Sequence, residues 1–153
     1  MNILARNKSG WELQEYLNIS EIELSEYPNV TGAFAIITVN GIFLIGYNSW
    51  RGQWEFPAGG IEENETARQA AVRELFEETH QKVDKLAFKG LFKVKTAKGD
   101  IKYQAAYYGK LDALRPFVSE ANDEMAEIML WDGLEDIGYV DEIDLTIARI
   151  VKE

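Results

Sequence analysis

Three glutamates and an arginine lie close together near the middle of the sequence. Glu74, Glu77 and Glu78 follow Arg73 in a run of good helix formers between residues 66 and 79. At about 100° per residue, the three glutamates fall within roughly a quarter to a third of the helix circumference, so their carboxylates converge on one face. Like charges at this spacing repel each other. A bound cation would relieve that repulsion, and the alternative is an acidic face open to solvent.

The surroundings of the cluster favour the functional interpretation. A loop with two glycines precedes the helix, Arg73 stands four residues before Glu77 as an ion-pair partner, and Glu65 lies at the junction of loop and helix. Carboxylate oxygens are hard ligands that suit Mg²⁺ or Mn²⁺, whereas one histidine and no cysteine disfavour zinc. A magnesium cluster here could neutralise a diphosphate and lower the pKa of a bound water that attacks phosphorus.

The segment PAGGIEENETARQAAVRELFEETHQ, residues 57–81, resembles the signature of the Nudix hydrolases. That signature is a glycine, five residues, a glutamate, seven residues, Arg-Glu, an aliphatic residue, any residue, Glu-Glu, any residue, a glycine and an aliphatic residue. Matches at this many fixed offsets are highly specific, and the flanks between residues 32 and 137 also look similar. The matching residues are Gly59, Glu65, Arg73, Glu74, Leu75, Glu77 and Glu78.

The resemblance implies a role for each matching position. Glu74 and Glu78 would bind the metal ion directly, and Glu77 would bind it directly or through a water molecule. Arg73 would orient the glutamates, and the carbonyl oxygen of Ala58 would complete the coordination. The implied fold is α/β, an α/β/α sandwich with a mixed sheet.

Other positions carry less of the resemblance. Glu65 would support the geometry of the loop and the helix. The general base varies within the family, and we nominate Glu120 or Glu124. Each of these two could equally be a solvated loop acid. His80 replaces the closing glycine and Gln81 the aliphatic residue. Because that glycine usually ends a helix in the left-handed region, which histidine visits more often than most residues, we expect altered loop geometry or modest destabilisation with the metal positions retained.

Length and charge limit the classes of function. The 153 residues suit a single domain, 1–153. A net charge of −10 and the lack of a basic stripe exclude extended nucleic acid as a partner, although a metal would still allow small nucleotides. The most apolar run, residues 33–39, is too short to cross a bilayer, and no secretory signal is visible, so we expect a cytoplasmic protein.

The elements expected around the cluster are two hairpins and two helices. Asn40-Gly41 joins the two apolar runs of residues 32–48 in a tight turn, and Lys98-Gly99 joins a second pair of strands. Residues 54–57 and 126–132 are further short strands, and 58–64 form a loop. The first helix spans residues 66–79 and packs through Val72, Leu75 and Phe76, with Ala67, Ala70 and Ala71 lying nearer the glutamates. The second helix spans residues 140–153 and has Ile143, Ile147 and Ile150 at helical spacing.

The resemblance implies hydrolysis of a nucleoside diphosphate linked to another moiety, such as a nucleoside triphosphate. The alternatives are an ADP-ribose or ADP-sugar substrate, a non-catalytic nucleotide sensor and an acidic docking domain. A prenyl diphosphate isomerase is a further relative of the fold, but it would need a cysteine. Residues 11–24 either add a strand to their own sheet or contact a partner in a homodimer.

The aromatic residues divide into two groups. Trp54 and Trp131 are expected in the core, and alternation along the strand would send some of Tyr103, Tyr107 and Tyr108 inward as well. Rings that could stack on a base belong to Tyr47, Trp50, Tyr103 and Phe117.

Overall fold

The computed structural model describes residues 2–120 and 123–152. In this part of the chain, no helix is long and apolar enough to cross a membrane. The elements are β1 (Ala5–Arg6), β2 (Glu12–Leu17), the 3₁₀ helix η1 (Glu21–Glu26), β3 (Val30–Val39), β4 (Ile42–Asn48), β5 (Gln53–Glu55), β6 (Ala58–Gly60), α1 (Ala67–Thr79), β7 (Ala87–Lys95), β8 (Ile101–Leu111), β9 (Met125–Trp131) and α2 (Glu142–Lys152).

The strands form one mixed sheet. Their order is β1-β2-β7-β8-β3-β4-β5, with β6 paired to β3 and β9 paired to β4. The central pair β3 and β8 is parallel, and the other named pairs are antiparallel. Strand β2 pairs with β7 of its own chain, which answers the question of whether the N-terminal segment extends its own sheet.

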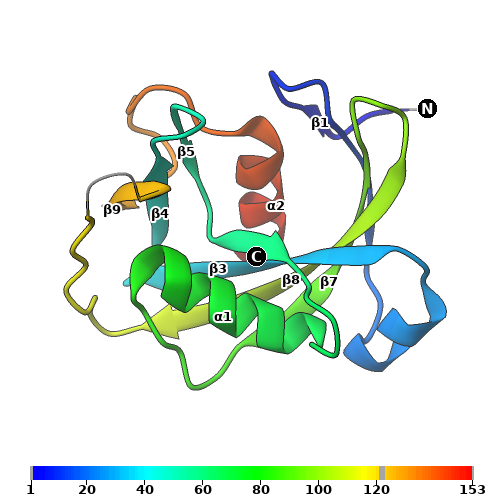
Figure 1. Ribbon diagram of the computed structural model, residues 1–153, viewed down its shortest axis with the longest axis horizontal. Helices are drawn as coiled ribbons and strands as arrows, with labels where there is room; N and C mark the ends of the chain where they lie inside the picture. The colour runs from blue at the N-terminus through cyan, green and yellow to red at the C-terminus, as the bar shows by residue number, and fades with distance from the viewer. Residues whose placement is uncertain (1, 121–122, 153) are drawn as a thin grey trace.

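Two helices cover opposite faces of this sheet (Figure 1). The alternation of side chains along β3 sends Phe34 and Ile36 into one core with Ile147 of α2. Ala35 and Ile37 enter the other core, which contains the buried residues of α1. The predicted α/β/α sandwich with a mixed sheet is therefore confirmed.

Local sequence signals set several turns and helix ends. Asn40 and Gly41 have φ values of 51° and 80°, the positive values that a tight I′-type turn needs. Thr66 caps α1, because its hydroxyl oxygen accepts a hydrogen bond from Gln69 N at 3.1 Å. The second predicted hairpin is also present, as β7 and β8.

Two expectations about local structure are wrong. Residues 58–64 are not all loop, because Ala58–Gly60 forms β6 and pairs with β3 in the register Ala33 to Gly59. Helix α1 does not pack through Val72 and Phe76, whose exposed fractions are 43% and 44%. Small residues allow the helix to approach the sheet closely, and the packing face is therefore made by Ala67, Ala70, Ala71 and Leu75, which are buried.

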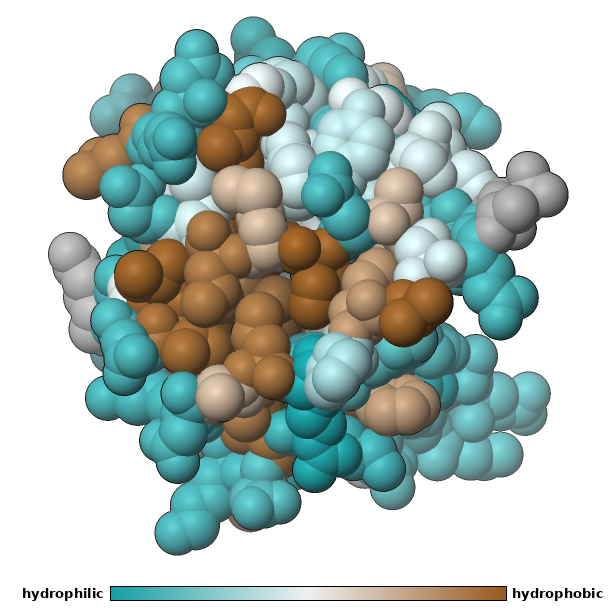
Figure 2. Space-filling model, turned by 90° about the vertical axis from the view of Figure 1, so that its left-hand side faces the viewer, coloured by the Kyte–Doolittle hydropathy of each residue, from teal (hydrophilic) through white to brown (hydrophobic). Residues whose placement is uncertain are grey.

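Apolar surface is gathered on the side of the molecule where β9 and β4 lie (Figure 2). Exposed apolar side chains on these two strands include Ile42 and Leu130, each 37% exposed. Strand β9 pairs with β4 along one side. This side of the sheet thus ends in a short strand with apolar side chains open to solvent.

Candidate active site

Strand β6 and helix α1 are joined by the glutamates of the helix. The backbone N–H of Ala58 donates a hydrogen bond to Glu78 Oε1 at 3.1 Å. The carboxylate of Glu74 lies directly on Gly59, where an added Cβ would stand 2.1 Å from Glu74 Cδ. Glycine at this position is therefore a steric requirement for the approach of Glu74 to the strand.

Arg73 connects four parts of the same region. Its Nε donates to Glu65 Oε2 at 2.8 Å, and its Nη1 donates to Glu74 Oε1 at 2.7 Å and to Glu77 Oε1 at 2.9 Å. Its Nη2 donates to the carbonyl oxygen of Gly60 at 2.8 Å. The guanidinium hydrogen bond lowers the pKa of Glu65. Arg73 therefore fixes the loop before the helix and orients two glutamates by direct contact.

The glutamates open into a pocket of about 440 Å³, called here the carboxylate pocket. Burial raises the pKa of Glu78 to about 9, against the hydrogen bond from Ala58, and the charges of Glu74 and Glu124 add to the rise. Burial also raises the pKa of Glu74. A cation would offset this unfavourable concentration of negative charge. The lining residues are Glu74, Glu77, Glu78, His80, Asp123, Glu124 and Met125.

The two nominated bases occupy different places. Glu124 lines the carboxylate pocket, and its Oε2 accepts a hydrogen bond from Asn48 Nδ2 at 2.9 Å and lies 3.5 Å from Arg51 Nη1. Glu120 is exposed and is not among the residues that line this pocket. The structure thus brings only Glu124 to the other glutamates, and its role as a base stays a prediction.

The donor set of the carboxylate pocket suits a hard divalent cation in its chemistry. It offers carboxylate oxygens at several positions and no thiolate; the thioether of Met125 and the imidazole of His80 are the softer groups in its lining. Within residues 2–120 and 123–152, no three acidic or histidine side chains already stand close enough together to hold an ion. Arg73 forms ion pairs with Glu74 and Glu77 in this structure. Because the side chain of Glu77 is 52% exposed, it has room to turn towards an ion.

The conserved-domain model of the NUDIX domain matches residues 27–152. The chain belongs to the NUDIX family. The match covers the carboxylate pocket, β6 and both helices, so the resemblance stated from the sequence is confirmed.

Two curated relatives of this NUDIX protein match shorter segments. An RNA pyrophosphohydrolase of Hydrogenovibrio crunogenus is 43% identical over 51 residues, which are 33% of this chain and 30% of the relative. An RNA pyrophosphohydrolase of Dinoroseobacter shibae is 52% identical over 40 residues, 26% of this chain and 25% of the relative. The matched segments thus span less than a third of either relative.

Solved structures show the same fold over more of the chain. A pyrophosphohydrolase of Bacillus subtilis has a TM-score of 0.72 at 20% identity, covering 94% of this chain and 87% of that chain. A bifunctional NMN adenylyltransferase/ADP ribose pyrophosphatase of Francisella tularensis, complexed with AMP and a manganese ion, has a TM-score of 0.57 at 21% identity, covering 80% and 41%. These likenesses establish the NUDIX architecture.

The departures from the NUDIX signature are accommodated at the end of α1. His80 takes φ 61° and ψ 19°, the left-handed conformation expected of the glycine it replaces, and its ring lies 4.8 Å from that of Phe117. Gln81 is fully buried; its Nε2 donates to the carbonyl oxygen of Arg115 at 2.8 Å, and its Oε1 accepts from Arg115 N at 2.7 Å. Gln81 thus ties the segment after β8 to the end of the glutamate helix.

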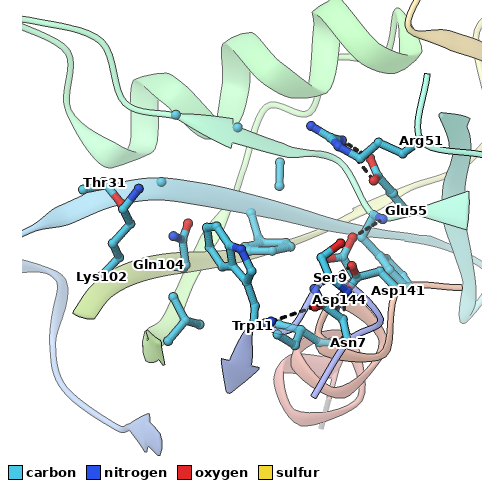
Figure 3. Close-up of a pocket in the computed structure, with 18 of the residues that line it drawn as sticks. Asn7, Ser9, Trp11, Thr31, Arg51, Glu55, Lys102, Gln104, Asp141 and Asp144 are labelled. Atoms are coloured by element: carbon cyan, nitrogen blue, oxygen red, sulfur yellow. Dashed lines mark hydrogen bonds and ion pairs between the residues drawn. The ribbon is translucent and has the colours of Figure 1, made fainter. Parts of the chain in front are cut away.

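A second pocket of this NUDIX protein lies on the other side of β6, with a volume of about 430 Å³; we call it the Trp11 pocket (Figure 3). Sequence reasoning missed it, because none of Tyr47, Trp50, Tyr103 and Phe117 lines either pocket. Trp11, which stands beside the first turn, is the sequence feature that could have indicated this pocket. The lining includes Asn7, Trp11, Thr31, Arg51, Glu55, Lys102, Gln104, Asp141 and Asp144, with Ala58, Gly59 and Gly60 of β6.

A polar network joins the two pockets. Arg51 Nη1 donates to both carboxylate oxygens of Glu55 at 3.0 Å. Asn48 Nδ2 donates to Glu55 Oε1 at 3.0 Å and to Glu124 Oε2 at 2.9 Å. The wall of the Trp11 pocket is therefore connected through one amide to the carboxylate pocket.

Proposed function

We propose that this protein is a Mg²⁺-dependent pyrophosphohydrolase that attacks, with water, a phosphorus of a nucleoside diphosphate linked to another moiety. The observation that carries the proposal is that Glu74, Glu78 and Glu124 line one pocket, with Glu74 directly against Gly59. The two curated relatives named RNA pyrophosphohydrolase support the reaction class. A nucleoside triphosphate or a modified nucleotide is the substrate that we favour for this chain.

Each residue of the site has a role that follows from its position. Glu74, Glu77 and Glu78, with the carbonyl oxygen of Ala58, would hold the metal, and Mn²⁺ could replace Mg²⁺ on the same oxygens. When bound, the cation would neutralise diphosphate oxygens and acidify water. Arg73 holds the glutamates at the edge of β6, so that their oxygens are positioned before substrate arrives.

Glu124 is the group that we assign as proton acceptor for the attacking water. It lies in the carboxylate pocket, and the amide of Asn48 fixes one of its oxygens. The other oxygen has no hydrogen bond from a described residue. It would accept a proton as the O–P bond forms and the leaving phosphate or nucleotide departs with the bond electrons. Because charge spreads over the phosphoryl oxygens, positioning and electrostatics suffice, and no covalent nucleophile is needed.

Two other functions use the same site. ADP-ribose or an ADP-sugar would present the same diphosphate with a second sugar in place of the terminal phosphates. A non-catalytic nucleotide sensor would bind the nucleotide without turnover. The retention of every glutamate of the signature supports hydrolysis over sensing.

The test is product analysis by ³¹P NMR in ¹⁸O-labelled water. The panel contains nucleoside triphosphates, oxidised nucleotides, ADP-ribose and a short 5′-triphosphorylated RNA, each with Mg²⁺. We expect turnover by the native protein, loss of turnover in Glu78→Gln, and normal turnover in Glu63→Gln, which makes the same change on the exposed loop. No turnover of any panel member, with Mg²⁺ bound, would favour the sensor; no binding of Mg²⁺ at all would contradict the metal site.

We also propose that the protein can form a homodimer through the apolar surface of β4 and β9. Ile42 and Leu130 are each 37% exposed there, and contiguous exposed apolar surface commonly marks a site of protein association. Light scattering across a concentration series measures the mass directly. A dimer that is lost in Leu130→Glu supports this surface, whereas a monomer at every concentration contradicts it.

A further inference from the structure

We propose that the Trp11 pocket binds the nucleobase of the substrate and selects a 6-oxopurine, which in natural nucleotides is guanine. The inference rests on the proposed function for the phosphates, and it adds the identity of the base. It is carried by the order of groups along the pocket: carboxylates at one end, an indole ring in the middle, and an amide and an ammonium group at the other end (Figure 3).

The indole of Trp11 supplies a surface for stacking. Trp11 stands just before β2 and is held there by the first turn, because its backbone N–H donates to Asn7 Oδ1 at 3.0 Å. The ring is only partly buried, and the ammonium of Lys102 lies 5.7 Å from its centroid. An indole whose backbone is held by hydrogen bonds and which is partly open to a pocket of about 430 Å³ is suited to a flat aromatic ligand.

The acceptor end of the pocket is formed at the start of α2. Asp144 accepts a hydrogen bond from Phe56 N at 2.9 Å, and Asp141 accepts from Asn7 Nδ2 at 3.1 Å. Both carboxyl groups line the pocket. Because Asp141 Oδ1 also accepts from the backbone N–H groups of Ile143 and Asp144, the carboxyl oxygen that has no hydrogen bond among the described residues is Asp144 Oδ1. Two neighbouring N–H donors, such as N1–H and N2–H₂ of guanine, suit carboxyl oxygens at this end, and hydrogen bonds from them would favour the ionised form of Asp144.

The opposite end offers donors. Lys102 and Gln104 lie two residues apart on β8, so their side chains share a face. Within the described residues, the side-chain amide of Gln104 makes no hydrogen bond, although it is partly buried and lines the pocket. It lies across Gly32, where a Cβ would stand 2.0 Å from Gln104 Oε1. The O6 and N7 acceptors of guanine are the matching groups.

Other bases match this order less well. Adenine has no N–H at N1 or C2 for the carboxylate end, and its N6 amino group would face the ammonium of Lys102. A single-ring pyrimidine has no N7 acceptor for the donor end. The pocket also connects to the reaction site, because Arg51 lines it and lies 3.5 Å from Glu124 of the carboxylate pocket.

The test uses binding without turnover. Calorimetric titration of the full chain with GMP, AMP, CMP and UMP, which have no phosphoanhydride bond, measures base preference independently of hydrolysis. We expect GMP to bind at least about tenfold more tightly than the other three, since each wrong base leaves polar groups unpaired. Trp11→Ala should weaken GMP binding about tenfold or more, whereas Trp50→Ala, which removes an exposed indole outside both pockets, should leave it unchanged.

Two further variants test the edges of the base. Asp144→Asn replaces an acceptor oxygen by a donor, and Gln104→Ala removes the donor at the other end, so each should lower the ratio of GMP to AMP affinity. Equal affinity for GMP and AMP in the native protein, or an unchanged GMP affinity in Trp11→Ala, would overturn the assignment. Guanine-selective binding without hydrolysis of any panel substrate would remove the proposed function and keep this pocket. Hydrolysis of a panel substrate without base preference in binding would keep the proposed function and overturn the assignment of this pocket.

Discussion

The carboxylate of Glu74 rests on the α-carbon of Gly59, so closely that a Cβ at position 59 would stand 2.1 Å from Glu74 Cδ. This contact lies where the glutamate helix approaches β6. At the neighbouring residue of the strand, Ala58 N donates a hydrogen bond to Glu78. The signature glycine and the signature glutamates therefore act as one steric unit.

Gly59→Ala should displace Glu74 and lower kcat about a hundredfold, because a shift of ~1 Å at a reacting site can cost that much. The unfolding free energy should change little, because the atoms in the way are the end of a flexible side chain that can move aside. The matched control is Gly60→Ala, whose Cβ would meet only Thr31 O at 3.8 Å, an ordinary contact. Steady-state kinetics and urea unfolding of both variants give the comparison. Equal loss of kcat in both would contradict the steric explanation.

Arg73→Ala should lower both stability and activity. It removes the hydrogen bonds to Glu65, Glu74 and Glu77 and leaves like charges facing each other. Since the Arg73 side chain is 23% exposed, we expect a loss of roughly 1–3 kcal/mol in unfolding free energy, together with a fall in kcat. Arg68→Ala is the control on the same helix: it breaks the pair with Glu21 at 2.8 Å and should change stability without changing kcat.

Glu124→Gln should lower kcat by about 10²–10⁴-fold, the usual contribution of a general base. Glutamine retains the size of the side chain and can still accept a hydrogen bond from Asn48. Glu120→Gln, on an exposed residue outside the carboxylate pocket, should remain near native activity. The pH dependence of kcat in the two variants is the measurement. If Glu120→Gln gave the larger loss, the base would have to be reassigned.

Asp144 should make stability depend on pH. Burial raises the pKa of Asp144 well above its usual value, and the charges of Asp141 and Glu55 raise it further. Between the ordinary pKa and this raised pKa, the folded protein holds a proton that the unfolded chain has released. The contribution of Asp144 to stability is therefore present at acid pH and is lost as pH rises through the folded-state pKa.

The Asp144→Asn variant cannot ionise at this position. The unfolding free energy of the variant minus that of the native protein should therefore increase as the pH is raised from pH 5 to pH 8. Urea unfolding at the two pH values measures the difference. Asp132→Asn is the control, because backbone N–H groups of Glu135 and Leu134 lower the pKa of Asp132, so that it is ionised in both states over this range. Its difference from the native protein should stay constant. A constant difference for Asp144→Asn would contradict a raised pKa.

The sequence by itself determined the features that depend on near neighbours along the chain. The Thr66 cap, the turn at Asn40-Gly41 and the contact from Arg73 to Glu77 each involve residues within four positions of each other. Even the departure at His80 was readable, because the left-handed conformation that ends a helix is a local property. The spacing of the signature then indicated the family.

Only the tertiary structure decided which distant residues meet. The apolar pattern of α1 suggested that Val72 and Phe76 pack, but the sheet approaches from the alanine side and leaves both exposed. Glu120 and Glu124 were equivalent in sequence, and Asn48 on β4 holds one of them in the carboxylate pocket. Trp11, Gln104 and Asp144 come together from separate elements. Their proximity arises from sheet order and helix packing, which no short-range pattern encodes.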